Sequence, residues 1–89
     1  MEALDQLAHA LALDAPTPEE TAAILDVARD VAHTIERRIT PVSTFLLGMD
    51  VQRRVAAGST RSAAVSAAIE ELRGAMPAGS SRERPEPTR

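Results

Sequence analysis

The chain has 89 residues and a formal net charge of -3, and 44% of its residues are hydrophobic although Phe45 is its one aromatic residue. This length allows one small domain, whose core has to be built mainly from Ala, Leu, Ile, Val and Met side chains. The lack of cysteine excludes disulfides, thiol nucleophiles and thiolate metal sites. The acidic balance disfavours a general nucleic-acid binder, which needs a concentrated basic surface.

The first predicted element is a short amphipathic helix from Glu2 to about Leu13. Its apolar residues recur at intervals of three and four, which places them on one stripe of a helix. The stripe consists of Leu4, Leu7, Ala8, Leu11 and Ala12. The sequence Asp14-Ala15-Pro16 then breaks the helix.

The second predicted helix opens with an explicit start signal and runs from Pro18 to about Arg38. Thr17 offers a hydroxyl to the free N–H groups of the first turn, Pro18 suits the first helical position, and Glu20 completes a capping box. The predicted apolar face comprises Ile24, Leu25, Ala28, Val31, Ala32, Ile35 and Ile39. A polar stripe on the other side comprises Asp26, Arg29, Asp30, His33 and Arg37.

The third predicted helix begins at Pro41, after a second start signal at Thr40, and ends at about Ala57. It is apolar on more than one side and includes Phe45, so we expect it to be the central helix. Glycine at position 48, in its middle, costs about 0.5 to 1 kcal/mol relative to alanine. We expect close packing of another helix against Gly48 to offset this cost, and access for a ligand or a partner is the alternative.

A fourth helix is predicted from about Thr60 to Ala75 or Met76, after a stop at Gly58. Its predicted core face comprises Val65, Ala68, Ile69, Leu72 and Met76. Short connections make sequential helices antiparallel neighbours, so the predicted fold is all-α, a compact four-helix bundle over residues 1–76. A three-helix core with a loosely docked first helix is the alternative. Residues 77–89 are rich in Pro, Ser, Arg and Glu and are predicted to form a disordered C-terminal tail.

The polar stripe of the second helix is the first candidate site. Asp30 and His33 share a helix face and could supply a base or two metal ligands. Pairs at this spacing, including Asp26 with Arg29, are usually weak ion pairs on a solvated surface. We therefore predict no catalytic residue, no metal and no cofactor. The predicted partner-binding surface comprises Arg29, Asp30, His33, Arg37 and Thr44.

A second candidate site lies at the junction of the second and third helices. Arg37 and Arg38 precede the free N–H groups of the helix that begins at Pro41, and such groups attract anions. Ser43 and Thr44 add hydroxyl donors, so these four residues form a candidate anion site. In the alternative interpretation the arginines complement the negative end of the second helix, while Thr40 and Ser43 cap the third.

Two segments of the sequence stand out: the run Leu25-Asp26-Val27-Ala28-Arg29-Asp30-Val31-Ala32-His33, and after it Glu36-Arg37, Pro41 and Thr44-Phe45-Leu46-Leu47-Gly48. Together these segments resemble a small uncharacterised bacterial helical domain. That family occurs alone or appended to the C-terminal end of molybdenum-cofactor guanylyltransferases. The matching motif positions are Arg29, Asp30, His33, Pro41, Thr44 and Gly48. The resemblance implies an accessory role in the synthesis or delivery of molybdopterin guanine dinucleotide. It makes a guanylyltransferase or a molybdoenzyme the expected partner.

The sequence as a whole predicts a non-enzymatic protein-interaction domain. A module that binds a small phosphorylated ligand through Arg37 and Arg38 is the alternative function. No predicted helix carries a basic face that would read DNA, and the oligomeric state is left open. The acidic start of the chain does not resemble a signal peptide, and no apolar run approaches the ~20 residues of a membrane span. We therefore expect a cytoplasmic location.

Overall fold

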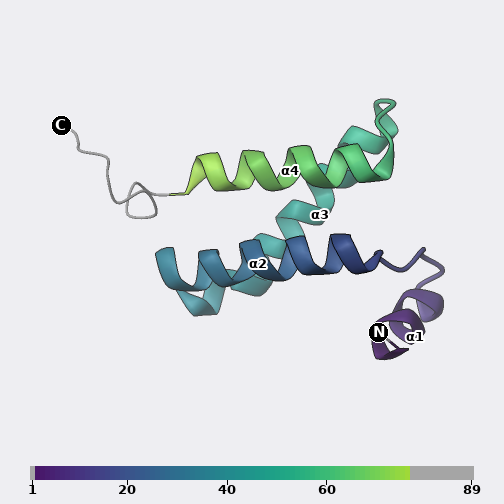
Figure 1. Ribbon diagram of the computed structural model, residues 1–89, viewed down its shortest axis with the longest axis horizontal. Coiled ribbons are helices and arrows are strands. Elements are labelled where there is room, and N and C mark those ends of the chain that lie inside the picture. Colours follow the sequence, from purple (N-terminus) through teal and green to yellow (C-terminus); the bar gives the residue numbers. More distant parts are fainter. Residues whose placement is uncertain (1, 77–89) are drawn as a thin grey trace.

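The computed structural model describes residues 2–76, which form helices joined by short connections (Figure 1). The elements are α1 (Glu2–Ala10), α2 (Pro18–Thr34), the 3-10 turn η1 (Arg37–Ile39), α3 (Thr40–Ala56) and α4 (Arg61–Ala75). No strand is present within residues 2–76. The predicted all-α class and its four helices are confirmed, and the predicted tail at residues 77–89 lies outside the described residues.

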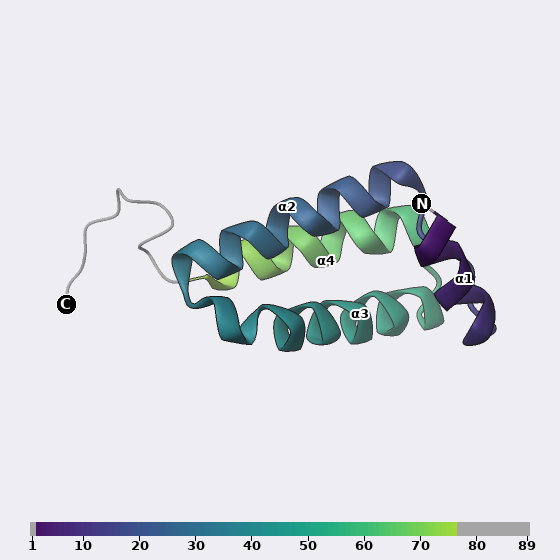
Figure 2. The ribbon, with the colours of Figure 1, turned by 90° about the horizontal axis from the view of Figure 1, so that it is seen from below.

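Three of the helices form the packed part of the molecule. In Figure 2, α3 runs antiparallel to both α2 and α4, and each pair among these three helices is in contact. Helix α1 lies beyond the end of this bundle at which α2 begins, and it packs against none of the other described helices. It also contains no buried residue. The packed core is thus the three-helix arrangement, with the first helix at its end.

The start of α2 is fixed by the predicted capping box. The backbone N–H of Glu20 donates to the Thr17 hydroxyl at 3.0 Å, and the backbone N–H of Thr17 donates to the Glu20 carboxylate at 3.0 Å. Pro18 occupies the first turn. The same carboxylate lies 3.2 Å from the guanidinium of Arg61, so the beginnings of α2 and α4 are tied together. The structural roles predicted for Thr17, Pro18 and Glu20 are confirmed.

Helix α1 ends at Ala10, earlier than the predicted Leu13, in a tight turn. Ala12 adopts a left-handed conformation with φ 58°, and the N–H of Leu13 donates back to the carbonyl of Ala8 at 2.8 Å. This bond pattern is a Schellman motif, in which glycine usually takes the left-handed position. The turn directs α1 away from the bundle instead of along it.

The junction between α2 and α3 differs from the prediction. Helix α2 ends at Thr34 and not at about Arg38, because Glu36 is extended, with φ -168° and ψ 149°. In one continuous helix the N–H of residue 41 would donate to the carbonyl of Arg37, but Pro41 has no N–H and its ring would clash with that carbonyl. Pro41 therefore disfavours one continuous helix through this region. Arg37 consequently lies in η1 and does not belong to the polar stripe of α2.

The core is small and made of aliphatic side chains. Its buried members are Val27, Val31, Leu47, Ala64, Val65, Ala68 and Ile69. The predicted core face of α4 is confirmed, and its alanines allow α3 to approach closely. Two other predictions were wrong: Leu25 is 59% exposed while Val27, two positions later and therefore on the opposite side of α2, is completely buried. Phe45, predicted to be structural, is 66% exposed.

Alanine substitutions in α2 test which face meets the core. Val27→Ala removes about two buried methylene equivalents and leaves a cavity, so we expect the free energy of unfolding to fall by about 2 kcal/mol. Leu25→Ala is the matched control and should change it by less than about 0.5 kcal/mol. Urea denaturation followed by circular dichroism measures both, and a larger loss at Leu25 would contradict this packing.

Candidate functional site

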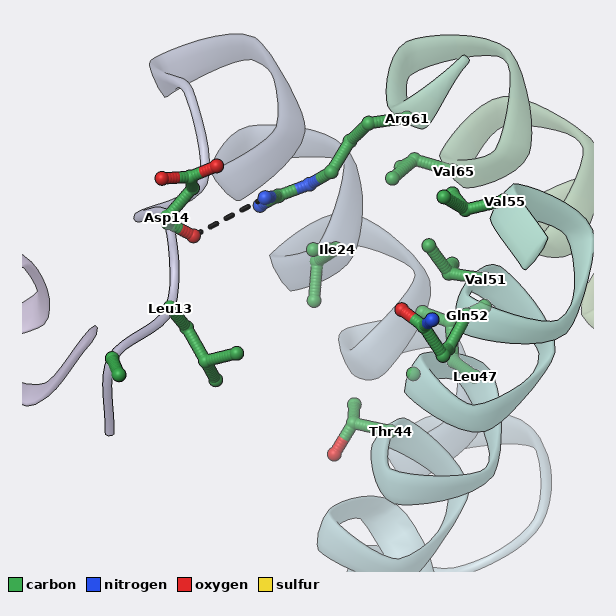
Figure 3. A pocket seen from close by; sticks show the side chains of 12 residues that line it. Leu13, Asp14, Ile24, Thr44, Leu47, Val51, Gln52, Val55, Arg61 and Val65 are labelled. Carbon is green, nitrogen blue, oxygen red and sulfur yellow. Dashed lines mark hydrogen bonds between the residues drawn. The ribbon is translucent and has the colours of Figure 1, made fainter. Parts of the chain in front are cut away.

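An open groove of about 500 Å³ lies between the α1–α2 connection and the three packed helices (Figure 3). Ile24 of α2, Val51 of α3 and Val65 of α4 contribute apolar side chains to it. Leu13, in the connection, faces these helices from the other side. The groove is therefore mainly apolar, and elements distant in the sequence form its walls.

Gly48 lines this groove at the middle of α3. A Cβ atom built on Gly48 would meet no atom within 4 Å beyond its chain neighbours and the adjacent backbone of α3. The prediction that another helix packs closely against this glycine was wrong, because the space beside it is open. Access for a ligand or a partner, the alternative predicted for Gly48, remains a prediction.

The polar groups around the groove are mostly engaged within the chain. The Arg61 guanidinium donates to the Asp14 carbonyl at 3.2 Å and pairs with Glu20, so it holds the α1–α2 connection beside α4 (Figure 3). The Thr44 hydroxyl, which lines the groove, donates to the carbonyl of Pro41 at 2.8 Å. An occupant of the groove would therefore meet apolar surface with polar groups at its edges.

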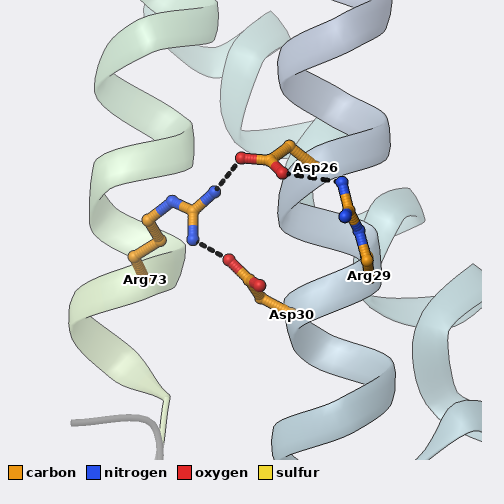
Figure 4. Close-up of polar contacts among 4 residues, drawn as sticks. All are labelled: Asp26, Arg29, Asp30 and Arg73. Atoms are coloured by element: carbon orange, nitrogen blue, oxygen red, sulfur yellow. Dashed lines mark hydrogen bonds and ion pairs between the residues drawn. The ribbon is translucent and has the colours of Figure 1, made fainter.

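A second cluster joins α2 to α4. Arg73 of α4 donates one hydrogen bond to the Asp26 carboxylate at 3.2 Å and another to the Asp30 carboxylate (Figure 4). Asp26 also accepts from Arg29 at 3.0 Å, as the sequence predicts. The hydrogen-bond partner of Asp30 is therefore Arg73 and not His33. The spacing within α2 predicts only the local pair, because the guanidinium of Arg73 arrives from a helix more than forty residues away in the chain.

The predicted partner-binding residues do not form one surface. Arg29, Asp30 and His33 belong to α2, where Asp30 faces α4 through Arg73. Arg37 lies in η1, and Thr44 lies in the groove on α3. The structure therefore divides the predicted set between the seam of α2 with α4, the junction and the groove.

The contact with Arg73 also changes the acidity of Asp30. The hydrogen bond from Arg73 lowers the pKa of Asp30 below its ordinary value of 3.8, although desolvation acts in the opposite direction. Asp50 of α3 behaves in the same way: burial raises its pKa, but hydrogen bonds from Arg54 and Arg53 outweigh that effect and leave it lowered. Arg54 also reaches Glu71 of α4 at 3.3 Å.

The candidate anion site at the start of α3 has fewer free donors than its sequence indicates. The Ser43 hydroxyl is buried and donates to the Thr40 carbonyl at 2.9 Å. Thr40 is the first residue of α3, and Ile39 precedes it without a side-chain cap, so the predicted capping by Thr40 and Ser43 was wrong. Arg38 lies 3.8 Å from Glu36 and is otherwise exposed. Anion binding by Arg37, Arg38, Ser43 and Thr44 remains a prediction.

Within residues 2–76, no group of three or more His, Cys, Asp or Glu side chains is arranged to hold a metal ion. None of the helices in this part of the chain is both long enough and apolar enough to cross a membrane.

The fold and groove define a small all-α domain with a three-helix core, an apolar cleft and a detached first helix. Residues 2–84 match the model of a family described as a domain of unknown function, DUF6457, and the chain belongs to that family. No curated protein and no solved structure matches the chain. Membership of a small uncharacterised family is confirmed, whereas the association with molybdenum-cofactor guanylyltransferases remains a prediction.

Acid titration tests the contact between α2 and α4. The pKa of Asp30 in the folded chain lies below the ordinary 3.8, so the ionised carboxylate stabilises the fold. This contribution is complete above pH 3.8 and is lost as the pH falls through the lowered pKa of Asp30. We expect Asp30→Asn to be less stable than the parent chain at neutral pH, with a difference that shrinks as the pH drops below 3.8. Urea denaturation at a series of pH values measures this difference.

Arg73→Gln is the matched control for this titration, because it removes the cation and keeps both carboxylates. In that background Asp30→Asn should have a much smaller effect on stability at neutral pH. A difference between parent and Asp30→Asn that is constant across the acidic range would contradict the assigned contact.

Proposed function

We propose that this chain is a non-enzymatic protein-interaction domain whose apolar groove receives a segment of a partner protein. The partner that we propose is an enzyme of molybdenum-cofactor synthesis or delivery, either a guanylyltransferase or a molybdoenzyme. The observation that carries the first part of the proposal is the open space beside Gly48. The second part rests on the sequence resemblance of residues 25–48.

Glycine in the middle of a helix needs an explanation, because it is destabilising relative to alanine. No neighbouring atom of the described chain requires Gly48, and its φ is not in the left-handed region. The remaining physical reason is an external group that approaches the backbone of α3 closely. Such an approach is typical of helix or extended-segment recognition, in which apolar pockets take side chains and small residues let the backbones meet.

The shape and chemistry of the groove favour a peptide segment as its occupant. Its walls offer Ile24, Val51 and Val65, whose burial by a partner would be favourable in water. The groove is open to solvent and not an enclosed cavity, which suits a passing segment of chain better than a small molecule. Leu13 of the α1–α2 connection adds an exposed apolar side chain at the rim.

The polar residues of α2 have two separate roles in this proposal. Asp30 holds α2 against α4 through Arg73, so its contribution is to stability. Arg29 and His33 are the exposed members of the predicted set on α2, and Arg29 also pairs with Asp26 at 3.0 Å. Replacing Arg29 and His33 together therefore tests that surface without removing the contact of Asp30 with α4.

Binding of a phosphorylated small molecule is retained as a second proposal. The start of α3 has no side-chain cap, and Arg37 is exposed beside it. The Thr40 N–H donates to the Arg37 carbonyl and Pro41 has no N–H, so in this proposal the anion meets the N–H groups that follow Pro41. Titration of the isotope-labelled chain with inorganic phosphate and with a mononucleotide tests this. We expect amide shifts confined to residues 37–45, and unchanged spectra at millimolar ligand would refute the second proposal.

Methyl groups added at two glycines provide a matched test of the groove. Gly48→Ala places a methyl in open space, so the free energy of unfolding should rise by about 0.5 to 1 kcal/mol. The same methyl should weaken binding of a purified molybdenum-cofactor guanylyltransferase from the same cell, and Gly48→Leu should abolish it. Gly74→Ala, in α4 and outside the groove, should leave binding unchanged. Isothermal titration calorimetry measures the affinities.

The outcomes separate the two parts of the proposal. If the parent chain captures other proteins but neither the guanylyltransferase nor a molybdoenzyme, and Gly48→Leu abolishes that capture, the groove is supported and the molybdenum link fails. If Gly48→Leu binds every partner as tightly as the parent chain does, the groove assignment itself fails.

A further inference from the structure

Helix α1 carries apolar side chains that stay largely exposed in the described chain. Leu7 is 62% exposed, and Leu11, one turn later on the same face, is 68% exposed. The helix has no buried residue and contacts none of the other described helices. An amphipathic helix of nine residues is too short to be stable in water by itself, so its apolar face needs a surface on which to pack.

The chain runs from α1 directly onto the groove beside Gly48. Residues 12–14 line this groove, and the Leu13 side chain faces the packed helices across it (Figure 3). Leu13 is nevertheless 64% exposed, so the connection fills little of the groove. The contact between the connection and the groove is therefore already made, and α1 is the segment that continues from it.

The anchor at Asp14 determines how α1 could lie in the groove. Arg61, the first residue of α4, donates to the Asp14 carbonyl at 3.2 Å, and α4 begins beside the end of α3 because these two helices are antiparallel (Figure 2). A helix that turned back from Asp14 would run along α3, with its own start towards Thr44. The α3 wall from Thr44 to Val55 is about 16 Å long and α1 is about 13 Å long, so the wall accommodates the whole helix.

In this orientation Leu7 comes level with Gly48. Leu7 precedes Asp14 by the same number of residues as Gly48 precedes Val55, and Asp14 and Val55 line the same end of the groove as Arg61. A Cβ atom on Gly48 would meet no neighbouring side chain, so the space above this backbone is open to an entering leucine. The groove thus matches α1 in length, in polarity and in the position of its open space.

Ala12 is the residue at which α1 turns away from the groove. Its φ of 58° is the one positive value among the non-glycine residues of the described chain, and this conformation is disfavoured for alanine. The Leu13 N–H, which donates to the Ala8 carbonyl at 2.8 Å, helps to hold the turn. An extended Ala12 would lose this bond, release the disfavoured conformation and let α1 swing about the Asp14 anchor. Closing would then bury Leu7 and Leu11.

We propose that α1 is an intramolecular lid, which closes on the groove of its own chain through a change in the backbone conformation of Ala12. The arrangement with α1 away from the bundle is the open state, and the chain exchanges between the two. The lid is a property of the chain alone. Its role as a regulator of partner entry rests on the proposed function, because α1 and a partner segment would cover the same surface of α3.

Disulfide trapping of the full chain tests the lid, because the chain has no cysteine of its own. A disulfide needs two Cα atoms within about 7 Å, so Leu7→Cys with Gly48→Cys should cross-link only when α1 enters the groove. Leu7→Cys with Leu46→Cys is the matched control, since Leu46 is 57% exposed on α3 and does not line the groove. With oxidised glutathione, the groove pair should close at least about tenfold faster than the control pair.

Substitutions at Ala12 test the hinge in the chain that carries Leu7→Cys and Gly48→Cys. Glycine accepts the left-handed conformation and valine disfavours it, so Ala12→Gly should slow cross-linking by about threefold and Ala12→Val should speed it by a similar factor. Alkylation at timed intervals followed by mass spectrometry measures the rates. Circular dichroism of the reduced chains checks that each variant keeps its helices.

Three results would overturn the inference. Equal rates for the two cysteine pairs would show that α1 meets both sides of α3 alike and has no place in the groove. A disulfide between two chains, instead of within one, would assign the groove to a second copy. Rates that do not respond to either substitution at Ala12 would refute the hinge.

The cross-linking uses the chain without a partner, whereas calorimetry with the guanylyltransferase tests the proposed function. A failed lid therefore leaves the binding of a partner in the groove to be judged by calorimetry. A chain that binds no partner but forms the disulfide between Leu7→Cys and Gly48→Cys at the expected rate retains the lid.

Discussion

The packing of the helices and the exposure of the larger apolar residues both depend on a core that covers little apolar surface. Val27 and Val31 are the largest side chains that are completely buried, and the remaining core positions on α4 are filled largely by alanine and valine. Small side chains let α3 and α4 approach closely, so the core is dense but narrow. Several larger apolar residues, Phe45 among them, are consequently left on the outside, where they form exposed apolar surface.

Polar contacts complement this narrow core by fixing how the helices meet. Glu20 caps α2 and pairs with Arg61, Arg73 joins α2 to α4, and Arg54 joins Asp50 to α4. These contacts are at or near the surface and orient helices whose apolar seam is short. The arginine at each contact bridges more than one acceptor, which suits its forked guanidinium. The resulting frame presents α3 with one side in the core, one side in the groove and one side exposed.

The sequence predicts local features of this fold well, because their causes are local. The capping box at Thr17 and Glu20, the stop at Gly58 and the core face of α4 each depend on residues within one or two turns of a helix. The prediction of the buried face of α2 was wrong because this helix carries apolar residues on two sides. Periodicity alone does not show whether Leu25 or Val27 faces the core. The partner of Asp30 and the open space beside Gly48 depend on tertiary packing, and the spacing within one helix carries no information about either. The groove combines residues from four segments and was likewise beyond sequence reasoning.

Helices α2, α3 and α4 together make the packed core, while α1 stays outside it. Hydrogen exchange of the dilute, monomeric chain, followed by mass spectrometry, tests this most directly because it reports the opening free energy of each segment. We expect the slowest exchange around Val27, Leu47 and Ile69, and exchange in α1 close to that of an open chain. Protection of α1 equal to that of the core in the monomer would contradict it.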